Sequence, residues 1–197
     1  CLHCRMNLPL THFWERTHNP MADRFNDILQ KRLEKEWSPE RYAYACALFF
    51  YDSDGDYRHI TQNIKYNGDI PAGKHFGRML GSVMASCPHL EDISIVIPVP
   101  LHWRRKWKRG YNQAEVIAGG LACALGAEMK TDMLRRIRPT RSQTKLDVKG
   151  KEANVRDAFR AARTEGMAAP EGFSEGHILL VDDVFTTGST LLACFTA

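Results

Sequence analysis

The stretch Ile178-Leu-Leu-Val181-Asp182-Asp183-Val184-Phe185-Thr186-Thr187-Gly188-Ser189-Thr190 decides the fold of this chain. Its four leading apolar residues predict a short strand buried on both faces, as in a parallel sheet. The residues from Ser189 onward can open a helix. A buried strand, a turn and a helix in this order predict an α/β fold with a parallel central sheet flanked by helices.

The turn has the chemistry of a site for a phosphorylated sugar. A strand-to-helix junction directs backbone N–H groups and a helix dipole at one point, which suits a phosphate. Gly188 permits positive φ and a close approach of the backbone to the anion. Further donors are the hydroxyls of Thr186, Thr187, Ser189 and Thr190. Because Asp182 and Asp183 would repel a phosphate, we expect them to face solvent and to bind sugar hydroxyls or Mg²⁺.

The same stretch resembles the 5-phosphoribosyl-1-pyrophosphate (PRPP) signature of type I phosphoribosyltransferases: an apolar strand, two acids, then T-T-G-[ST]-T. The resemblance implies that the acids hold the ribose hydroxyls and that residues 186–190 hold the 5′-phosphate. A Walker A loop is excluded, since no Gly-Lys-[Ser/Thr] occurs. The alternative is a buried strand that ends in an acidic turn and caps a helix.

Composition indicates one domain with a small appendage. The chain has 197 residues, of which 44% are hydrophobic, and no apolar run approaches the roughly 20 residues of a membrane span. Six scattered cysteines favour reduced thiols, and no basic and apolar leader is visible, so we expect a cytoplasmic location. The chain stops seven residues after Thr190, which leads us to expect a truncated C-terminus.

Positive charge is concentrated in residues 101–163, which carry 16 Lys and Arg against 6 Asp and Glu. Aromatic residues alternate with the cations in its most basic part, as in proteins that bind single-stranded nucleic acid. The candidate contacts to single-stranded DNA are Trp103, Arg104, Arg105, Lys106, Trp107, Lys108 and Arg109. Pyrophosphate is the other anion that this region could face, and a solvated loop is the plain alternative.

A second buried strand is predicted over residues 93–97, followed by Pro98-Val99-Pro100-Leu101. Two prolines make the segment after the strand extended and rigid. Because ligands of parallel α/β sheets bind where strands end, Val99, Pro100 and Leu101 are candidates for a pyrophosphate loop that faces the two aspartates. The alternative is a rigid connector.

The remaining pattern predicts several further elements. Helices are expected from Asn19-Pro20 and over residues 57–66, 71–86 and 112–125, with another within 149–159; strands are expected over 41–51, 133–137 and 159–162. At the start, Cys1 and Cys4 form half of a zinc motif. They are either two zinc ligands whose partner pair is missing from this chain or ordinary residues, so structural Zn²⁺ is expected only in the full-length protein.

Four segments in order are similar to the ComF family, which groups competence-associated proteins with a zinc finger before a phosphoribosyltransferase domain. They are Ile97-Pro-Val-Pro-Leu101, Arg109-Gly-Tyr-Asn-Gln113, the run from Thr140 to Phe159, and the PRPP signature; residues 64–69 add a match to a family segment, LKYxGD. The resemblance implies an appendage over residues 1–50 and a phosphoribosyltransferase-like domain over 51–197. It also implies that Arg141, Gln143 and Lys145 lie on a mobile loop that closes over PRPP.

The function implied is transfer of a phosphoribosyl group from PRPP with Mg²⁺ and release of pyrophosphate. Asp182, Asp183 and Arg141 would serve catalysis, chiefly by orienting reactants and stabilising charge. The acceptor is not readable from the sequence. Two alternatives stay open: a competence factor that binds single-stranded DNA on the same scaffold, and a PRPP sensor without catalysis. The expected partners are PRPP or a ribose phosphate, with single-stranded DNA and a homodimer as further candidates.

Overall fold

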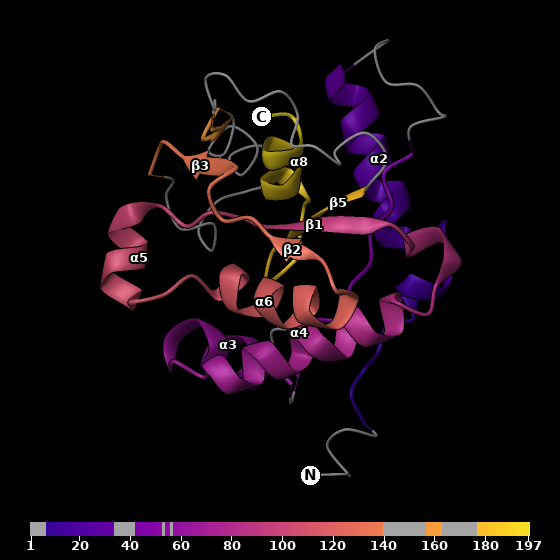
Figure 1. Cartoon of the computed structure of the whole chain (residues 1–197), viewed down its shortest axis with the longest axis horizontal. Helices are drawn as coiled ribbons and strands as arrows, with labels where there is room; N and C mark the ends of the chain where they lie inside the picture. The colour runs from indigo at the N-terminus through magenta and orange to yellow at the C-terminus, as the bar shows by residue number, and fades with distance from the viewer. Residues whose placement is uncertain (1–6, 34–41, 53, 56, 140–156, 163–176) are drawn as a thin grey trace.

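A computed structural model describes residues 7–33, 42–52, 54–55, 57–139, 157–162 and 177–197 (Figure 1). The helices are η1 (Phe13–Glu15), α2 (Pro20–Leu33), α3 (Arg58–Tyr66), α4 (Ile70–Met84), η3 (Pro88–Leu90), α5 (Trp103–Arg109), α6 (Gln113–Leu125) and α8 (Ser189–Phe195). The strands are β1 (Ile93–Pro98), β2 (Glu128–Met129), β3 (Leu134–Arg136), β4 (Phe159–Ala161) and β5 (His177–Val181). None of the described helices is long and apolar enough to cross a membrane.

The central sheet is parallel, with the strand order β2-β1-β5. Its middle strand, β1, is buried from Ile95 to Pro98 and contributes the fully buried Val96 to the core. Helices flank the sheet, so the predicted α/β class with a parallel sheet is confirmed. The predicted strand near residue 134 also forms, but β3 pairs with β4 in a separate antiparallel ribbon.

The prediction that the strand before the acidic pair is buried on both faces is wrong. Within the described part of the chain, β5 pairs only with β1 and lies at the edge of the sheet. Ile178 is 44% exposed, and burial increases along the strand to Val181, which is 6% exposed. The apolar run of β5 is thus shielded from solvent mainly at its carboxyl end, where the candidate site lies.

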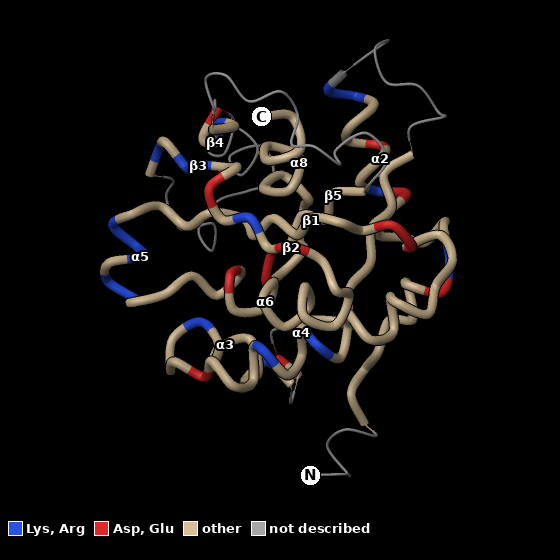
Figure 2. The backbone as a smooth tube through the Cα atoms, in the orientation of Figure 1, with Lys and Arg blue, Asp and Glu red and all other residues tan. Residues whose placement is uncertain are grey.

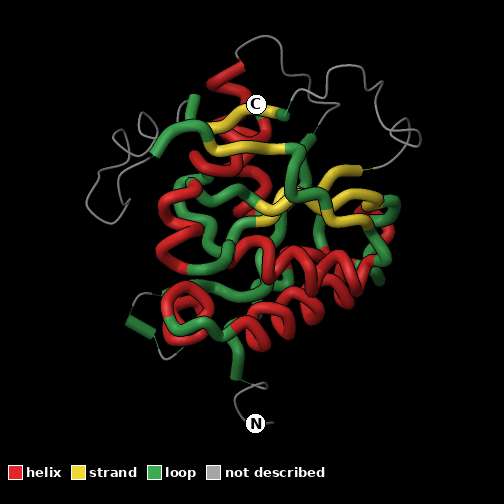
Figure 3. The backbone as a smooth tube through the Cα atoms, turned by 60° about the vertical axis from the view of Figure 1, so that its left-hand side comes forward, coloured by secondary structure: helices red, strands yellow, loops and turns green. Residues whose placement is uncertain are grey.

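Helices α4 and α6 lie side by side beneath the strands (Figure 3), at a separation that only glycine allows. A Cβ on Gly77 would come within 2.2 Å of the Ile117 carbonyl oxygen, and one on Gly120 within 2.3 Å of the Lys74 carbonyl oxygen. The 3.6-residue pattern predicts both helices but not this contact, because glycine carries no apolar signal. The close packing brings α6 against β1.

The N-terminal segment is joined to the sheet domain through α2. Asn19 caps this helix as predicted, since its Oδ1 accepts from the amides of Met21 at 3.1 Å and Ala22 at 3.0 Å. The strand predicted over residues 41–51 does not form in the described residues 42–51. Its place is taken by loop, with one isolated bridge between Leu10 and Phe49. The Asn26 side chain bonds to the backbone of Ala43, and the backbones of Leu48 and Phe50 bond to Thr11 and Pro9.

Candidate functional site

The carboxyl ends of β1 and β5 meet at one edge of the sheet. Pro98 is in register with Val181, and the amide of Val99 donates a hydrogen bond of 2.8 Å to the Val181 carbonyl oxygen. The segment from Val99 to Leu101 therefore lies next to Asp182 and Asp183. This juxtaposition is the one expected for a pyrophosphate loop and an acidic pair, although the ligands themselves remain predictions.

Asn112 holds the Val99 segment from the other side. Its Nδ2 donates to the Val99 carbonyl oxygen at 3.0 Å, while its Oδ1 accepts from the Ala114 amide at 3.2 Å and so caps α6. The side chain is 1% exposed. From the sequence, Asn112 was predicted only to start a helix. Its place in the Arg-Gly-Tyr-Asn-Gln segment could have indicated the second role, since this one side-chain amide both caps a helix and holds a loop.

His102 follows the Val99 segment and begins α5. It is buried, and its Nδ1 accepts from the Arg104 amide at 3.4 Å. Burial lowers the pKa of His102, and the positive charges of Arg104, Arg136 and Arg105 lower it further. The charges of these three arginines make this corner of the sheet electropositive, which suits an anion.

The acidic pair is less exposed than predicted. The Asp183 amide donates to Asp182 Oδ1 at 2.9 Å, and the Asp183 side chain is only 9% exposed. Burial raises the pKa of Asp182 to about 7, with a further contribution from the charge of Asp183. The expectation that both carboxylates face solvent is wrong for Asp183, because the segment around α3 covers it.

That covering segment contributes Lys65, a residue that the sequence analysis did not assign to the site. Its Nζ lies 2.6 Å from Asp183 Oδ2. Oδ2 is buried and accepts no hydrogen bond of favourable geometry within the described residues. The contact between Lys65 and Asp183 is therefore an ion pair and not an aligned hydrogen bond. The sequence feature that could have pointed to Lys65 as a site residue was the resemblance of residues 64–69 to a segment of the ComF family.

The Thr and Ser turn after the acidic pair has the conformation expected at Gly188. The φ of Gly188 is +77°, and a Cβ there would approach Ile28 Cδ1 to 2.8 Å. The hydroxyls of Thr187 and Ser189 share a hydrogen bond of 2.8 Å, and α8 starts at Ser189. The positive φ favours glycine at this position, while binding of a phosphate by this turn stays a prediction.

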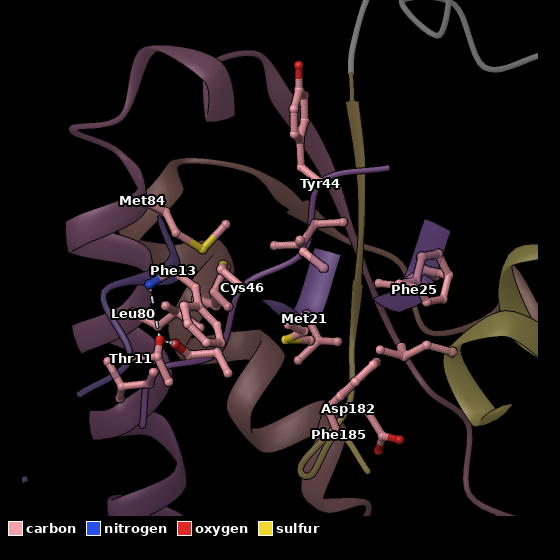
Figure 4. A pocket seen from close by; sticks show the side chains of 18 of the residues that line it. Thr11, Phe13, Met21, Phe25, Tyr44, Cys46, Leu80, Met84, Asp182 and Phe185 are labelled. Carbon is pink, nitrogen blue, oxygen red and sulfur yellow. Dashed lines mark hydrogen bonds between the residues drawn. The ribbon is translucent and has the colours of Figure 1, made fainter. Parts of the chain in front are cut away.

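A cavity of about 1200 Å³ runs along β5 and ends at the acidic pair. Figure 4 shows Tyr44 at one end and Asp182 with Phe185 at the other. Its walls are mostly apolar and aromatic, with Phe25 and Cys46 between these ends. Protein atoms packed around the Asp182 carboxyl disfavour its charged form, which is the main physical reason for its raised pKa.

The basic region predicted to contact DNA contains a helix that the sequence analysis did not predict, α5, at the edge of the molecule (Figure 2). Trp103 is 65% exposed and Trp107 87% exposed. Two of the predicted cations turn toward α6 instead of outward: Lys106 pairs with Glu115 at 2.8 Å, and Arg109 donates to Gln113. The helix therefore presents two tryptophans and a reduced set of cations.

Several predicted site residues lie outside the described part of the chain: Cys1, Cys4, Arg141, Gln143 and Lys145. Their roles in a zinc site and a mobile loop stay predictions. In the described residues, no group of three or more His, Cys, Asp and Glu side chains is arranged to hold a metal ion.

Comparison with known proteins identifies relatives of this chain. Over 135 residues, or 67% of the chain, the sequence is 30% identical to competence protein F of Haemophilus influenzae. The chain belongs to the ComF family. DNA utilization protein YhgH of Salmonella typhimurium is 35% identical over 97 residues and that of Escherichia coli K12 is 33% identical over 96, each covering 49% of this chain. No family model and no solved structure matched.

This ComF chain spans only part of its relatives. The matched region covers 57% of the Haemophilus protein and 39% of the Salmonella and Escherichia proteins. The relatives' names speak of competence and DNA utilization and do not state an enzymatic reaction. Activity and partners of this ComF chain are therefore matters for proposal.

Proposed function

We propose that this ComF chain is a phosphoribosyltransferase-like protein that binds PRPP with Mg²⁺ at the carboxyl edge of its parallel sheet and transfers the phosphoribosyl group to an acceptor. The observation that carries the proposal is the hydrogen bond between Val99 and Val181. It brings a rigid, proline-flanked segment and two aspartates to one edge, and a Thr and Ser turn with a positive-φ glycine follows the aspartates.

Each group then has a distinct task. Asp182 and Asp183 accept hydrogen bonds from the ribose hydroxyls, the 186–190 turn donates to the 5′-phosphate, and the 99–101 backbone lies along the pyrophosphate. Displacement at the anomeric carbon breaks its bond to pyrophosphate and forms a bond to the acceptor nucleophile. The protein orients these partners and stabilises the positive charge that develops on the sugar and the negative charge on the leaving group.

Magnesium would arrive as part of the substrate, bound to the pyrophosphate oxygens. The described residues suit that arrangement better than a resident metal site. Carboxylate oxygens are the ligands that Mg²⁺ prefers, but two adjacent carboxylates, one already paired with Lys65, supply too few for a cage made by protein alone. Bound with the substrate, Mg²⁺ would neutralise part of the charge on the leaving pyrophosphate.

Titration calorimetry with PRPP and Mg²⁺ tests the proposal. The wild-type chain should bind PRPP, and the double variant Asp182→Asn, Asp183→Asn should lose about tenfold or more in affinity, because charge-assisted hydrogen bonds are worth about 1.5–3 kcal/mol each. Asp132→Asn, at an exposed position before β3, is the matched control. Equal PRPP affinity in the double variant and wild type would refute the site; pyrophosphate release with candidate bases and amines then tests catalysis.

A second function, binding of single-stranded DNA, is favoured by α5. Its two exposed tryptophans stand one helical turn apart among cations, and Arg104 stacks 5.2 Å from the Trp103 ring centre. Bases stack on aromatic rings and phosphates pair with cations in proteins that bind single strands. The relatives named for competence and DNA utilization agree with this candidate. It uses a different surface from the acidic pair, so both functions can hold.

A further inference from the structure

We propose that Lys65 is a positioning residue for the acidic pair: it fixes Asp183 so that the pair recognises the vicinal hydroxyls of a ribose phosphate. This inference rests on the proposed function and deepens it. It is carried by the ion pair between Lys65 Nζ and Asp183 Oδ2, which join at 2.6 Å at the edge of the sheet.

The ion pair divides the Asp183 carboxylate into two oxygens with different surroundings. Oδ2, which meets Lys65, is fully buried, so the small exposed area of the side chain belongs to its other atoms. Oδ2 is therefore closed to a ligand, and Oδ1 is the Asp183 oxygen that is left to accept from a ligand hydroxyl. A cation on one oxygen sets the rotation of the whole carboxylate group and with it the direction of the free lone pairs.

Lys65 itself is held by the fold. It lies in the last turn of α3, and the preceding carbonyl, that of Ile64, accepts a hydrogen bond from the Tyr111 hydroxyl. The Arg109 guanidinium stacks 5.5 Å from the ring centre of the next residue, Tyr66. Arg109 is the last residue of α5 and Tyr111 follows it, so the stretch that leads to Asn112, which holds Val99, also contacts the end of α3.

Charge explains why the pair needs this lysine. Asp182 and Asp183 are adjacent and largely withdrawn from water, a situation in which one carboxyl tends to keep its proton. The other charged or titratable groups that act on Asp182 are Arg136 from β3 and Cys194 from α8. Within the described residues it is Lys65, and not Arg136, that makes an ion pair with Asp183. The Lys65 side chain is 28% exposed, and its Nζ has further hydrogens that can point to a ligand.

A comparison of two sugar phosphates tests the inference by calorimetry. Ribose 5-phosphate and 2-deoxyribose 5-phosphate share the phosphate but differ in one hydroxyl. Wild type should bind ribose 5-phosphate more tightly than 2-deoxyribose 5-phosphate. Lys65→Met should lose about tenfold in affinity for ribose 5-phosphate, so that the ratio of the two affinities falls toward one. Lys65→Arg, which keeps the charge, should restore most of the preference. Lys74→Met, on the exposed side of α4, should match wild type.

The outcomes separate this inference from the proposed function. If wild type binds neither PRPP nor ribose 5-phosphate, the proposed function fails and the inference with it. If wild type binds both and Lys65→Met keeps the full preference, or loses affinity for both sugars equally, positioning by Lys65 is overturned alone. A double variant distinguishes this role from general misfolding. If Lys65 acts through Asp183, adding Lys65→Met to the Asp183→Asn variant should change the affinity for ribose 5-phosphate by less than about twofold, because the Asp183→Asn change has already removed the interaction.

Discussion

The amide of Val99 and the carbonyl oxygen of Val181 are joined by a hydrogen bond of 2.8 Å, one residue beyond the last register pair of β1 and β5. The parallel ladder therefore continues past β1 into the proline-flanked segment. Any shift of this segment would move it relative to Asp182. The two halves of the candidate site are thus joined by a backbone hydrogen bond, and residues that support this backbone, such as Asn112, should affect ligand binding without touching the ligand.

Replacement of Asn112 by Ala should loosen the Val99 segment. The change removes the cap of α6, worth about 1 kcal/mol, and leaves the Val99 carbonyl without its donor, worth about 1–3 kcal/mol if it stays buried. We expect an unfolding free energy lower by about 2–4 kcal/mol in chemical denaturation. Asn112→Ser, which keeps a capping oxygen but is too short to reach Val99, should recover only the capping part. A full recovery by serine would contradict the role of the Val99 contact.

Replacement of Gly77 by Ala should disrupt the contact between α4 and α6. The new Cβ would lie 2.2 Å from the Ile117 carbonyl oxygen, so the helices must separate. Overpacking of this kind destabilises by about 1–3 kcal/mol or more. Gly119→Ala is the control on α6, since its Cβ would meet only Met129 Sδ at 3.9 Å. That change should be neutral or stabilise by up to about 1 kcal/mol through helix propensity. Thermal unfolding followed by circular dichroism distinguishes the two.

The partly buried Asp182 should make stability depend on pH. Its pKa is raised to about 7 in the folded chain, so the folded state binds the proton more tightly than the unfolded state. The tighter binding of the proton stabilises the folded state. This stabilisation is present in full below the pKa of Asp182 in the unfolded chain and is lost as pH rises through about 7. Asp182→Asn should therefore gain about 2 kcal/mol relative to wild type between pH 5 and pH 8, measured by urea denaturation without ligand. A constant difference across that range would show that Asp182 does not titrate there.

Single-stranded DNA should bind to α5 weakly and without sequence preference. If Arg104 and Lys108 each neutralise one phosphate, the logarithm of affinity should fall with the logarithm of salt concentration with a slope of about −1.4. Stacking on Trp107 should quench its fluorescence and contribute about 1–3 kcal/mol. Trp107→Ala should weaken binding, whereas Lys31→Ala with Arg32→Ala on α2 should not. Unchanged tryptophan fluorescence at low salt would exclude this surface.

Much of the architecture follows from local sequence. The apolar runs at β1 and β5, the cap at Asn19 and the 3.6-residue periodicity of α3, α4 and α6 predict those elements close to their observed bounds. Gly188 is predicted to adopt positive φ and does so. These features depend on backbone propensity and on burial along single segments, which a linear pattern records directly.

Other features depend on segments that are distant in the sequence. The position of β5 at the edge of the sheet as the described residues form it, the antiparallel pairing of β3 with β4 and the glycine contact between α4 and α6 depend on which surfaces meet. No local pattern specifies that choice, because a glycine or an apolar strand fits several partners equally well.

The candidate site shows the same division. The sequence by itself determined that two aspartates and a Thr and Ser turn follow one strand and that a rigid segment follows another. Only the tertiary structure decided that Val99 bonds to Val181, that Asn112 supports this contact and that Lys65 reaches Asp183. Sequence records which groups are present, but charge pairing and pKa depend on distance and burial, and these arise only when the chain packs.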